Sequence, residues 1–304
     1  MQISKEKFQI VGSRASEAER ISKPSLSFWK DVTIRFRKNK LAMFGIVLLI
    51  MLIFMAIAGP HMTDHDYRTN NLMNTNKAPS SEHWFGTDDL GRDVFARTWE
   101  GARISLFIGV AAALVDFFIG VFYGGLAGYK GGRIDDMMMR IADILWGIPY
   151  LLLVILLMVV LGQSVGTMIL AMTITGWINM SRIVRGQVLS LKNQEFVLAS
   201  RTLGADLPRI MGKHLIPNTM GPILVTMTLS IPSAIFTESF LSYLGLGLTP
   251  PFASWGTMAS DGLPALKYYP WRLFFPATFI CLTIFAFNVI GDGLRDALDP
   301  RLRK

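Results

Sequence analysis

The chain has 304 residues, of which 51% are hydrophobic and only 17% are charged, and its mean hydropathy is +0.40. A soluble domain usually carries about 25% charged residues, so this composition excludes an ordinary soluble globular protein. The formal charge of +8 raises the question of nucleic-acid binding, and the single cysteine, Cys281, excludes a disulfide within the chain.

Residues 1–23 are polar and are predicted to form a disordered cytoplasmic N-terminus. In residues 24–40, apolar side chains recur at helical spacing between Lys and Arg, which is typical of an amphipathic helix on a membrane surface. A tail held at the membrane by its charges alone is the alternative. Residues 41–59 are uncharged and long enough for one bilayer crossing. A long polar segment precedes them, so we interpret them as the first transmembrane helix and not as a signal peptide.

The rest of the chain divides into an extracytoplasmic loop over residues 60–103, a core of five further helices over residues 104–295, and a cytoplasmic tail over residues 296–304. The apolar stretches of this core cover about residues 104–129, 141–161, 165–180, 220–244 and 273–290. Together with the first stretch they give six transmembrane helices. The sequence therefore predicts an all-α membrane protein.

The basic residues are distributed unevenly among the connections between these stretches. Lys and Arg are concentrated in residues 1–40, 129–140, 181–217 and 295–304, and they are sparse in residues 60–103 and 246–272. Cytoplasmic loops of membrane proteins carry the excess of Lys and Arg. Both termini are therefore predicted to be cytoplasmic. The positive charge follows from this topology, and no separate basic domain suggests nucleic acid as a partner.

The connection before the fifth span, residues 188–217, is too long and too apolar for a simple turn. Gly204 can take the left-handed conformation that ends a helix, and Asp206 can cap the helix that follows. Pro208 then lies in the first turn, and Pro217 is expected to stop this second helix before the span. The sequence thus predicts two short cytoplasmic helices with exposed apolar residues, a surface that suits docking of another protein.

This segment resembles the coupling motif of permease subunits of ATP-binding-cassette (ABC) importers, written E-A-A-x3-G-x9-I-x-L-P. The spacing of Gly204 and Pro217 fits the motif, whereas Leu198 stands in place of its glutamate. The version found in peptide transporters, E-[FY]-V-x-A-[AS]-R-x-x-G-A, matches residues 195–205. The residues to which the resemblance assigns coupling to an ATPase are Glu195, Leu198, Ala199, Ser200, Arg201, Gly204, Ala205 and Pro217.

Further blocks resemble the C-type permease of dipeptide and oligopeptide ABC importers. They are HWFGTDDLGRD (residues 83–93), GARISL (101–106), ESFLSYLGLG (238–247) and DGLRDALDPR (292–301). With the coupling motif, the resemblance covers most of residues 24–304. It implies the type I ABC importer permease fold, in the cell membrane of a bacterium or an archaeon, and translocation of oligopeptides or dipeptides into the cytoplasm.

The resemblance also implies partners. This chain would pair with a second, related permease, two cytoplasmic ATPases would dock on its coupling helices, and an extracytoplasmic binding protein would deliver the peptide. ATP and Mg would bind to the ATPase subunits, with no cofactor on this chain. The residues agree with a non-catalytic subunit, because Gly212-Lys213 is followed by His214 and no Gly-x4-Gly-Lys-[Ser/Thr] phosphate loop occurs.

Two carboxylates within the spans are candidates for the substrate pathway. Asp116 lies near the middle of the second span, where an ionisable group is costly and usually faces a cavity, and Glu238 lies toward the outer end of the fifth span. A hydrogen bond between helices is the alternative role for Asp116. No metal site is predicted, because His61, His65 and His83 of the outer loop lack convincing ligand spacing.

Other functions with the same composition stay open. Nickel and glutathione importers share this permease type, so the resemblance leaves their substrates as alternatives. A stand-alone channel or an ion-coupled transporter is the alternative from another class. Such a protein usually has several ionisable residues at mid-membrane, and here only Asp116 clearly meets that expectation.

Overall fold

The structure is a computed structural model that describes residues 27–299. Within this range the chain is helical, no strand forms, and one isolated bridge pairs Thr87 with Asp93. The all-α prediction is therefore confirmed. The expected disordered segment, residues 1–23, and the end of the expected tail, residues 300–304, lie outside the described residues.

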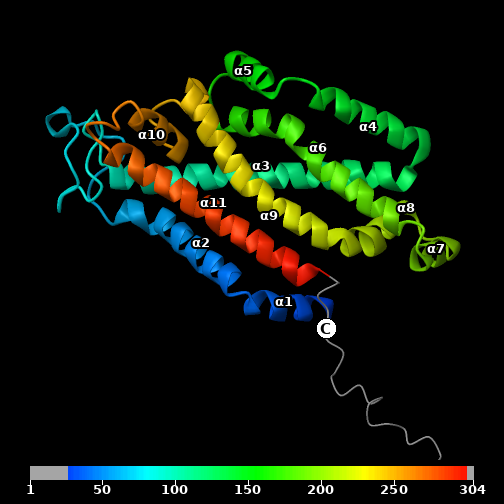
Figure 1. Cartoon of the computed structure of the whole chain (residues 1–304). Helices are drawn as coiled ribbons and strands as arrows, with labels where there is room; N and C mark the ends of the chain where they lie inside the picture. The colour runs from blue at the N-terminus through cyan, green and yellow to red at the C-terminus, as the bar shows by residue number, and fades with distance from the viewer. Residues whose placement is uncertain (1–26, 300–304) are drawn as a thin grey trace, which may run out of the picture.

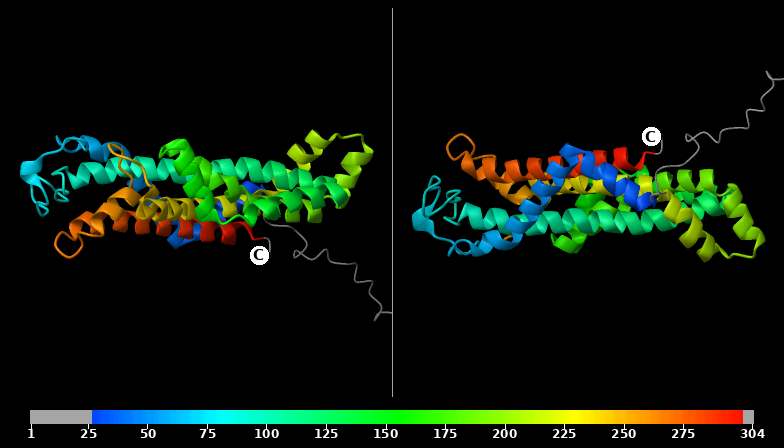
Figure 2. Two further views of the ribbon diagram at one scale, coloured as in Figure 1. Left: turned by 90° about the horizontal axis from the view of Figure 1, so that it is seen from above. Right: turned by 90° about the horizontal axis from the view of Figure 1, so that it is seen from below.

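Five long helices of the described chain run lengthwise through the molecule (Figure 1). They are α2 (Lys40–Ala58), α3 (Val94–Lys130), α6 (Val165–Leu191), α9 (Ile216–Leu241) and α11 (Trp271–Leu298). Helix α3 packs extensively on α6 and α9, and α11 packs on α2 and α9. The molecule is accordingly elongated along these helices (Figure 2).

Glycines allow α3 and α6 to approach closely. A Cβ atom at Gly124 would meet the backbone of Ser181, and one at Gly128 would lie 2.9 Å from the carbonyl oxygen of Arg185. Small residues permit such contacts where helices pack without water between them. This close contact fixes the two helices that carry several of the cavity residues described below.

The first helix, α1 (Phe28–Lys38), lies within the segment predicted to be amphipathic. Val32 is buried against the bundle, whereas Phe28 and Trp29 are exposed. Asn39 separates α1 from α2, and its side chain accepts a hydrogen bond from the backbone N–H of Ala42 at 3.1 Å. The location of α1 on the membrane surface stays a prediction.

Helix α3 begins at Val94, so its first turns occupy the end of the segment expected to be a loop, residues 60–103. Asp93 caps it by accepting a hydrogen bond from Ala96 N at 2.7 Å. The charged side chain of Arg103, at the end of that segment, has partners within the protein. Arg103 pairs with Glu100 at 2.9 Å and donates to the carbonyl oxygens that end α2. At the other end of the chain, α11 extends three residues into the expected tail, to Leu298.

The third predicted span, residues 141–161, is not one straight helix. Helix α4 (Gly132–Trp146) and helix α5 (Tyr150–Leu161) meet at an angle of 76°. Pro149 precedes α5, and the residue before a proline is disfavoured in the helical conformation. Gly147 and Pro149 together therefore break the apolar stretch that the hydropathy pattern had joined.

By length and composition, four helices of the described chain qualify as membrane crossings, and five do if the α4–α5 pair counts as one. Six crossings were predicted. The remaining one is α6, which is long enough but less apolar, with buried threonines and Ser181 facing its neighbours. Because α6 packs against α3, α5 and α9, these polar groups are enclosed by protein.

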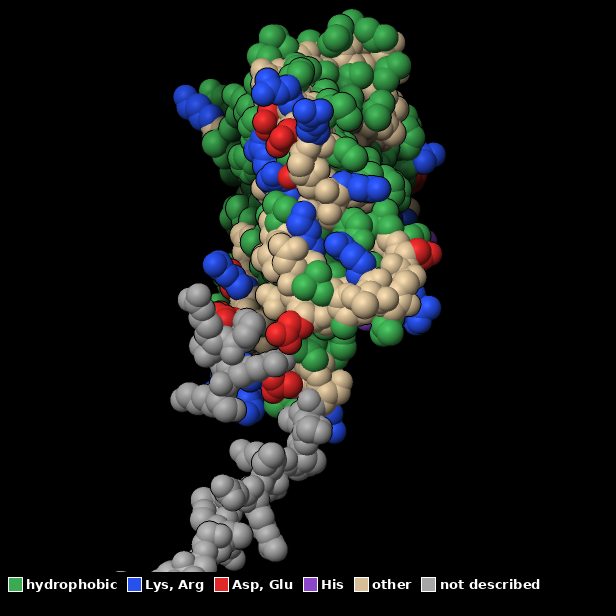
Figure 3. Space-filling view, turned by 90° about the vertical axis from the view of Figure 1, so that its right-hand side faces the viewer, with side chains coloured by type: hydrophobic (Ala, Val, Ile, Leu, Met, Phe, Trp, Pro, Cys, Tyr) green, Lys and Arg blue, Asp and Glu red, His purple; other side chains and the backbone are tan. Residues whose placement is uncertain are grey.

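The two ends of the bundle differ. One end carries η3 (Gly59–His61), η4 (Leu72–Asn74) and helix α10 (Trp255–Gly262), and the opposite end carries α7 (Glu195–Thr202) and α8 (Leu207–Ile210) (Figure 1). Viewed at the α7 end, the surface displays more Lys and Arg than Asp and Glu side chains (Figure 3).

Candidate functional site

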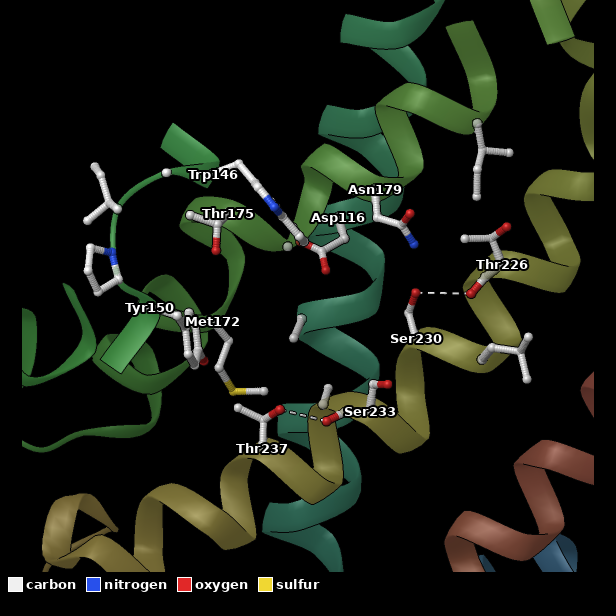
Figure 4. Close-up of a pocket in the computed structure, with 18 residues that line it drawn as sticks. Asp116, Trp146, Tyr150, Met172, Thr175, Asn179, Thr226, Ser230, Ser233 and Thr237 are labelled. Atoms are coloured by element: carbon white, nitrogen blue, oxygen red, sulfur yellow. Dashed lines mark hydrogen bonds between the residues drawn. The ribbon is translucent and has the colours of Figure 1, made fainter. Parts of the chain in front are cut away.

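A cavity of about 770 Å³ lies between α3, α6, α9 and the break between α4 and α5 (Figure 4). Trp146 and Tyr150 flank the break, and Met172 adds an adaptable apolar surface from α6. The polar side chains that line it are Asp116, Thr175, Asn179, Thr226, Ser230, Ser233 and Thr237. A cavity of this volume is large enough to hold a small organic ligand.

Helix α9 presents a stripe of four hydroxyl groups to this cavity. Thr226, Ser230, Ser233 and Thr237 are spaced by three or four residues, which places them on one face of the helix. Thr226, Ser230 and Thr237 donate to carbonyl oxygens of their own helix at 2.8–3.0 Å. Their oxygen lone pairs stay available as acceptors.

Asp116 is the only acidic residue in the lining, which contains no Lys, Arg or His among the described residues. Its Oδ1 atom is buried and has no hydrogen-bond partner within residues 27–299. Gly176 of α6 lies directly against the carboxyl group, so that a Cβ atom at that position would collide with it. The cavity wall thus contains one acidic side chain whose Oδ1 atom has no partner among the described residues.

We expect Gly176→Val to displace the Asp116 carboxyl group and to reduce transport strongly, because neither helix can yield without disturbing the α3–α6 contact. Gly166→Val is the matched control, since Gly166 also lies in α6 but a Cβ atom there would have only Ser164 Oγ, at 3.9 Å, as a neighbour. Uptake per molecule of membrane-inserted protein checks this expectation. Equal uptake by the two variants would contradict it.

Glu238 does not face this cavity, which differs from its predicted place on the substrate pathway. It is fully buried and accepts hydrogen bonds from Ser105 at 3.2 Å, Ser242 at 3.0 Å and Ser254 at 2.5 Å. These hydroxyls come from α3, from the turn after α9 and from the start of α10. The carboxyl group therefore ties three elements together, which periodicity along α9 alone could not reveal.

The coupling segment follows the predicted helix–glycine–helix pattern. Gly204 has φ +81°, and Ala205 N donates to Ser200 O while Gly204 N donates to Arg201 O, both at 3.0 Å. This pair of hydrogen bonds is the Schellman motif that ends a helix in the left-handed conformation. Asp206 then caps α8 by accepting from Arg209 N at 3.0 Å.

The predicted stop at Pro217 is wrong. Helix α8 passes through a π-turn over Met211–Leu215 directly into α9, where Pro217 occupies the first turn. The wider π-turn accommodates the missing proline N–H, and the side-chain amide of Asn218 donates to His214 O at 2.6 Å. The second short helix and the fifth span are thus continuous.

The structure brings most of the predicted coupling residues together on α7 and the turn that follows. Ser200 Oγ lies 3.1 Å from His214 Nε2, and Arg201 lies over the ring of Tyr129. Val197 is fully buried, whereas Leu203 at the tip is 87% exposed. Phe196, Leu198 and Glu195 are also exposed, so α7 is fixed to the bundle by one face and offers an apolar tip outward.

This architecture defines an integral membrane permease, with a central cavity and a projecting helix–turn–helix segment. The chain belongs to the family of binding-protein-dependent transport system inner membrane components, whose model matches residues 120–304. Residues 27–79 match the N-terminal transmembrane domain of oligopeptide transport permease C. Members of this family are permease subunits and are not themselves the ATPase.

The relatives extend over the whole chain. The oligopeptide transport system permease protein OppC of Bacillus subtilis is 67% identical over 99% of both chains. The dipeptide transport system permease protein DppC of the same organism is 60% identical, over 100% of this chain and 95% of its own. OppC of Escherichia coli is 43% identical, over 94% of this chain and 95% of its own.

A solved structure supports the fold. A chain of the MetNI methionine ABC transporter in an inward-facing conformation is 18% identical and gives a TM-score of 0.54. The match covers 66% of this chain and 94% of that one. The predicted type I importer permease fold is therefore confirmed.

Proposed function

We propose that this chain forms one half of the pathway of an ABC importer that carries short peptides into the cytoplasm. The observation that carries the proposal is the cavity of about 770 Å³, which combines one acidic side chain, with an unpartnered oxygen atom, and a stripe of hydroxyl acceptors. The names of the OppC and DppC relatives support peptides as the substrate class.

The chemistry of the lining argues against the other two substrates. A nickel pathway would be expected to offer imidazole or several carboxylates, and the described lining holds Asp116 alone. Glutathione carries net negative charge, which a cavity with an acidic group and no basic one disfavours. The N-terminal ammonium group of a peptide, in contrast, complements Asp116.

The partners are part of the same proposal. A second, related permease closes the open side of the cavity, two cytoplasmic ATPases that hold ATP and Mg dock on α7, and an extracytoplasmic binding protein delivers the peptide. The basic side chains at the α7 end support a cytoplasmic position for that end (Figure 3). The uneven distribution of Lys and Arg along the sequence supports the same position for both termini. Closure of the ATPases pushes α7, and α8 passes this movement to α9, with which it is continuous. Because α9 lines the cavity, its movement opens the cavity alternately to the two sides of the membrane.

Uptake of a labelled tripeptide, of glutathione and of nickel, measured in cells with and without this gene, tests the proposal. Loss of ATP-dependent tripeptide uptake alone supports it. Unchanged tripeptide uptake with loss of nickel uptake would move the substrate to the metal and leave the architecture as described. Uptake that survives removal of ATP would instead favour a channel or an ion-coupled transporter.

A further inference from the structure

Two histidines and a carboxylate that are far apart in sequence meet at the end of the bundle opposite α7. One possible ligand atom from each of His65, His83 and Asp93 lies within 4.8 Å of the others. The imidazole rings of the two histidines are 4.4 Å apart between centroids and tilted by 31°. His83 and Asp93 are buried, and His65 is half-buried, so solvent reaches the cluster from one side.

Each ring has one nitrogen committed to an oxygen acceptor. His83 Nδ1 lies 2.8 Å from Asp93 Oδ2, and His65 Nε2 lies 3.2 Å from the carbonyl oxygen of Glu82. Since a carboxylate and a carbonyl oxygen can only accept, these nitrogens carry the protons. In the neutral rings the lone pairs are then on His83 Nε2 and His65 Nδ1.

These lone pairs have no partner within the described residues. The side chain of His83 is only 4% exposed, and its Nε2 atom is buried without a hydrogen bond. No hydrogen bond reaches His65 Nδ1 either. Burying an acceptor without a hydrogen-bond partner destabilises a fold, so such an atom calls for a ligand. Histidines that bind metal show the same arrangement, with the second ring nitrogen held by a carboxylate or a backbone carbonyl.

We propose that His65 and His83 bind a divalent first-row transition-metal cation such as Zn²⁺, with Asp93 as the residue that orients His83. Imidazole nitrogen suits this class of cation, and water supplies the remaining ligands from the exposed side of His65. The metal joins two parts of the loop of residues 60–93, and the contact between His83 and Asp93 links this loop to the start of α3, which Asp93 caps. This site is separate from the cavity and does not depend on the transported substrate.

Zinc binding to the purified complex, with all partner subunits and a tag free of histidine, tests the proposal. The sample is stripped with a chelator, and Zn²⁺ is titrated in competition with a chromophoric chelator. We expect one Zn²⁺ per chain in the wild type and loss of that Zn²⁺ in His65→Ala. His61 is an exposed histidine close by in the sequence, and His61→Ala should still bind one Zn²⁺. His65 is half-buried, so its removal should leave the core intact. Equal stoichiometry in the wild type and His65→Ala would overturn the proposal.

Asp93→Asn supplies the test of orientation. Asn caps a helix as well as Asp does, so α3 keeps its start. With its oxygen committed to Ala96 N, the Asn side chain turns its NH₂ group toward His83 Nδ1, which favours the tautomer with the proton on Nε2 and so weakens metal binding there. We expect affinity roughly 10–100-fold weaker at unchanged thermal stability of the stripped protein. Wild-type affinity in Asp93→Asn, or Co²⁺ absorption spectra identical in wild type and His83→Gln, would contradict the assignment.

Discussion

Replacement of Gly204 by valine is expected to abolish ATP-driven uptake while the protein stays in the membrane at wild-type level. Gly204 has φ +81°, a conformation that costs a residue with a Cβ atom about 1–2 kcal/mol and a β-branched residue more. Nothing lies within 4 Å of a Cβ atom at this position, so the strain falls on the backbone of the turn alone. The strain changes the angle between α7 and α8, and movement of docked ATPases no longer reaches α9.

Two further variants separate this effect from loss of folding. Gly186→Val introduces the same side chain at an exposed glycine of α6, outside the coupling segment, where a Cβ atom would also have no neighbour within 4 Å, and it should transport normally. Gly204→Asn should retain most activity, because asparagine adopts the left-handed conformation more readily than valine. Peptide uptake and peptide-stimulated ATP hydrolysis are measured together. Full uptake by Gly204→Val would refute the coupling role of the turn.

Replacement of Asp116 by asparagine is expected to slow uptake of peptides with a free N-terminus by roughly 10- to 100-fold. A hydrogen bond to a charged group contributes about 1.5–3 kcal/mol, and about 1.4 kcal/mol corresponds to a tenfold change in rate. Asparagine keeps the shape of the side chain next to Gly176, so the packing of α3 on α6 is preserved. Initial uptake rates in reconstituted vesicles that contain the whole importer give the measurement.

An N-acetylated peptide of the same sequence serves as the control for Asp116→Asn. The binding protein also distinguishes the two peptides, but it is the same in both samples. For each peptide, the ratio of the uptake rate of the variant to that of the wild type therefore removes its contribution. We expect the substitution to slow the free peptide and to leave the acetylated one nearly unchanged. The same slowing of both peptides would mean that Asp116 supports the helices and does not contact the ammonium group.

Several features of the fold could be predicted because they depend on local sequence. The helix α2 could be predicted from the length and hydropathy of a charge-free stretch. The turn at Gly204 could be predicted from the backbone conformations that glycine allows. Gly204 adopts the expected left-handed conformation, and Asp206 caps the next helix as expected. Such features need no knowledge of what packs against them.

Other features depended on contacts that hydropathy does not report. The start of α3 looked polar because its charged residues are visible in the sequence, while the pairing of Arg103 with Glu100 and with the end of α2 is not. The apolar run 141–161 hid the bend between α4 and α5, although Gly147 and Pro149 were available as signals. Pro217 was expected to end a helix, because proline lacks the N–H group that a helix interior uses. The π-turn that accommodates it has no clear pattern in sequence, so the continuity of α8 with α9 was missed.

The same distinction applies to the sites. The hydroxyl stripe of α9 was detectable from its spacing of three and four residues, and it was not singled out beforehand. The fully buried position of Glu238 depends on three serines from three elements. Similarly, His65 and His83 lie 18 positions apart, and only the folded loop brings their rings together. Sequence spacing is informative within a helix, and it loses that value across a loop.

Thiol labelling of the cavity tests most directly the central claim that this cavity is the peptide pathway and opens alternately to the two sides. Cys281, the single cysteine, is replaced by serine, and cysteine is introduced at Ser233 in the wall of the cavity. The account predicts that an impermeant maleimide reaches this cysteine from the α7 side without ATP, and from the opposite side when ATP is bound and hydrolysis is blocked. Transported peptide should protect the cysteine in both states. Labelling that is independent of ATP, side and peptide would contradict the account.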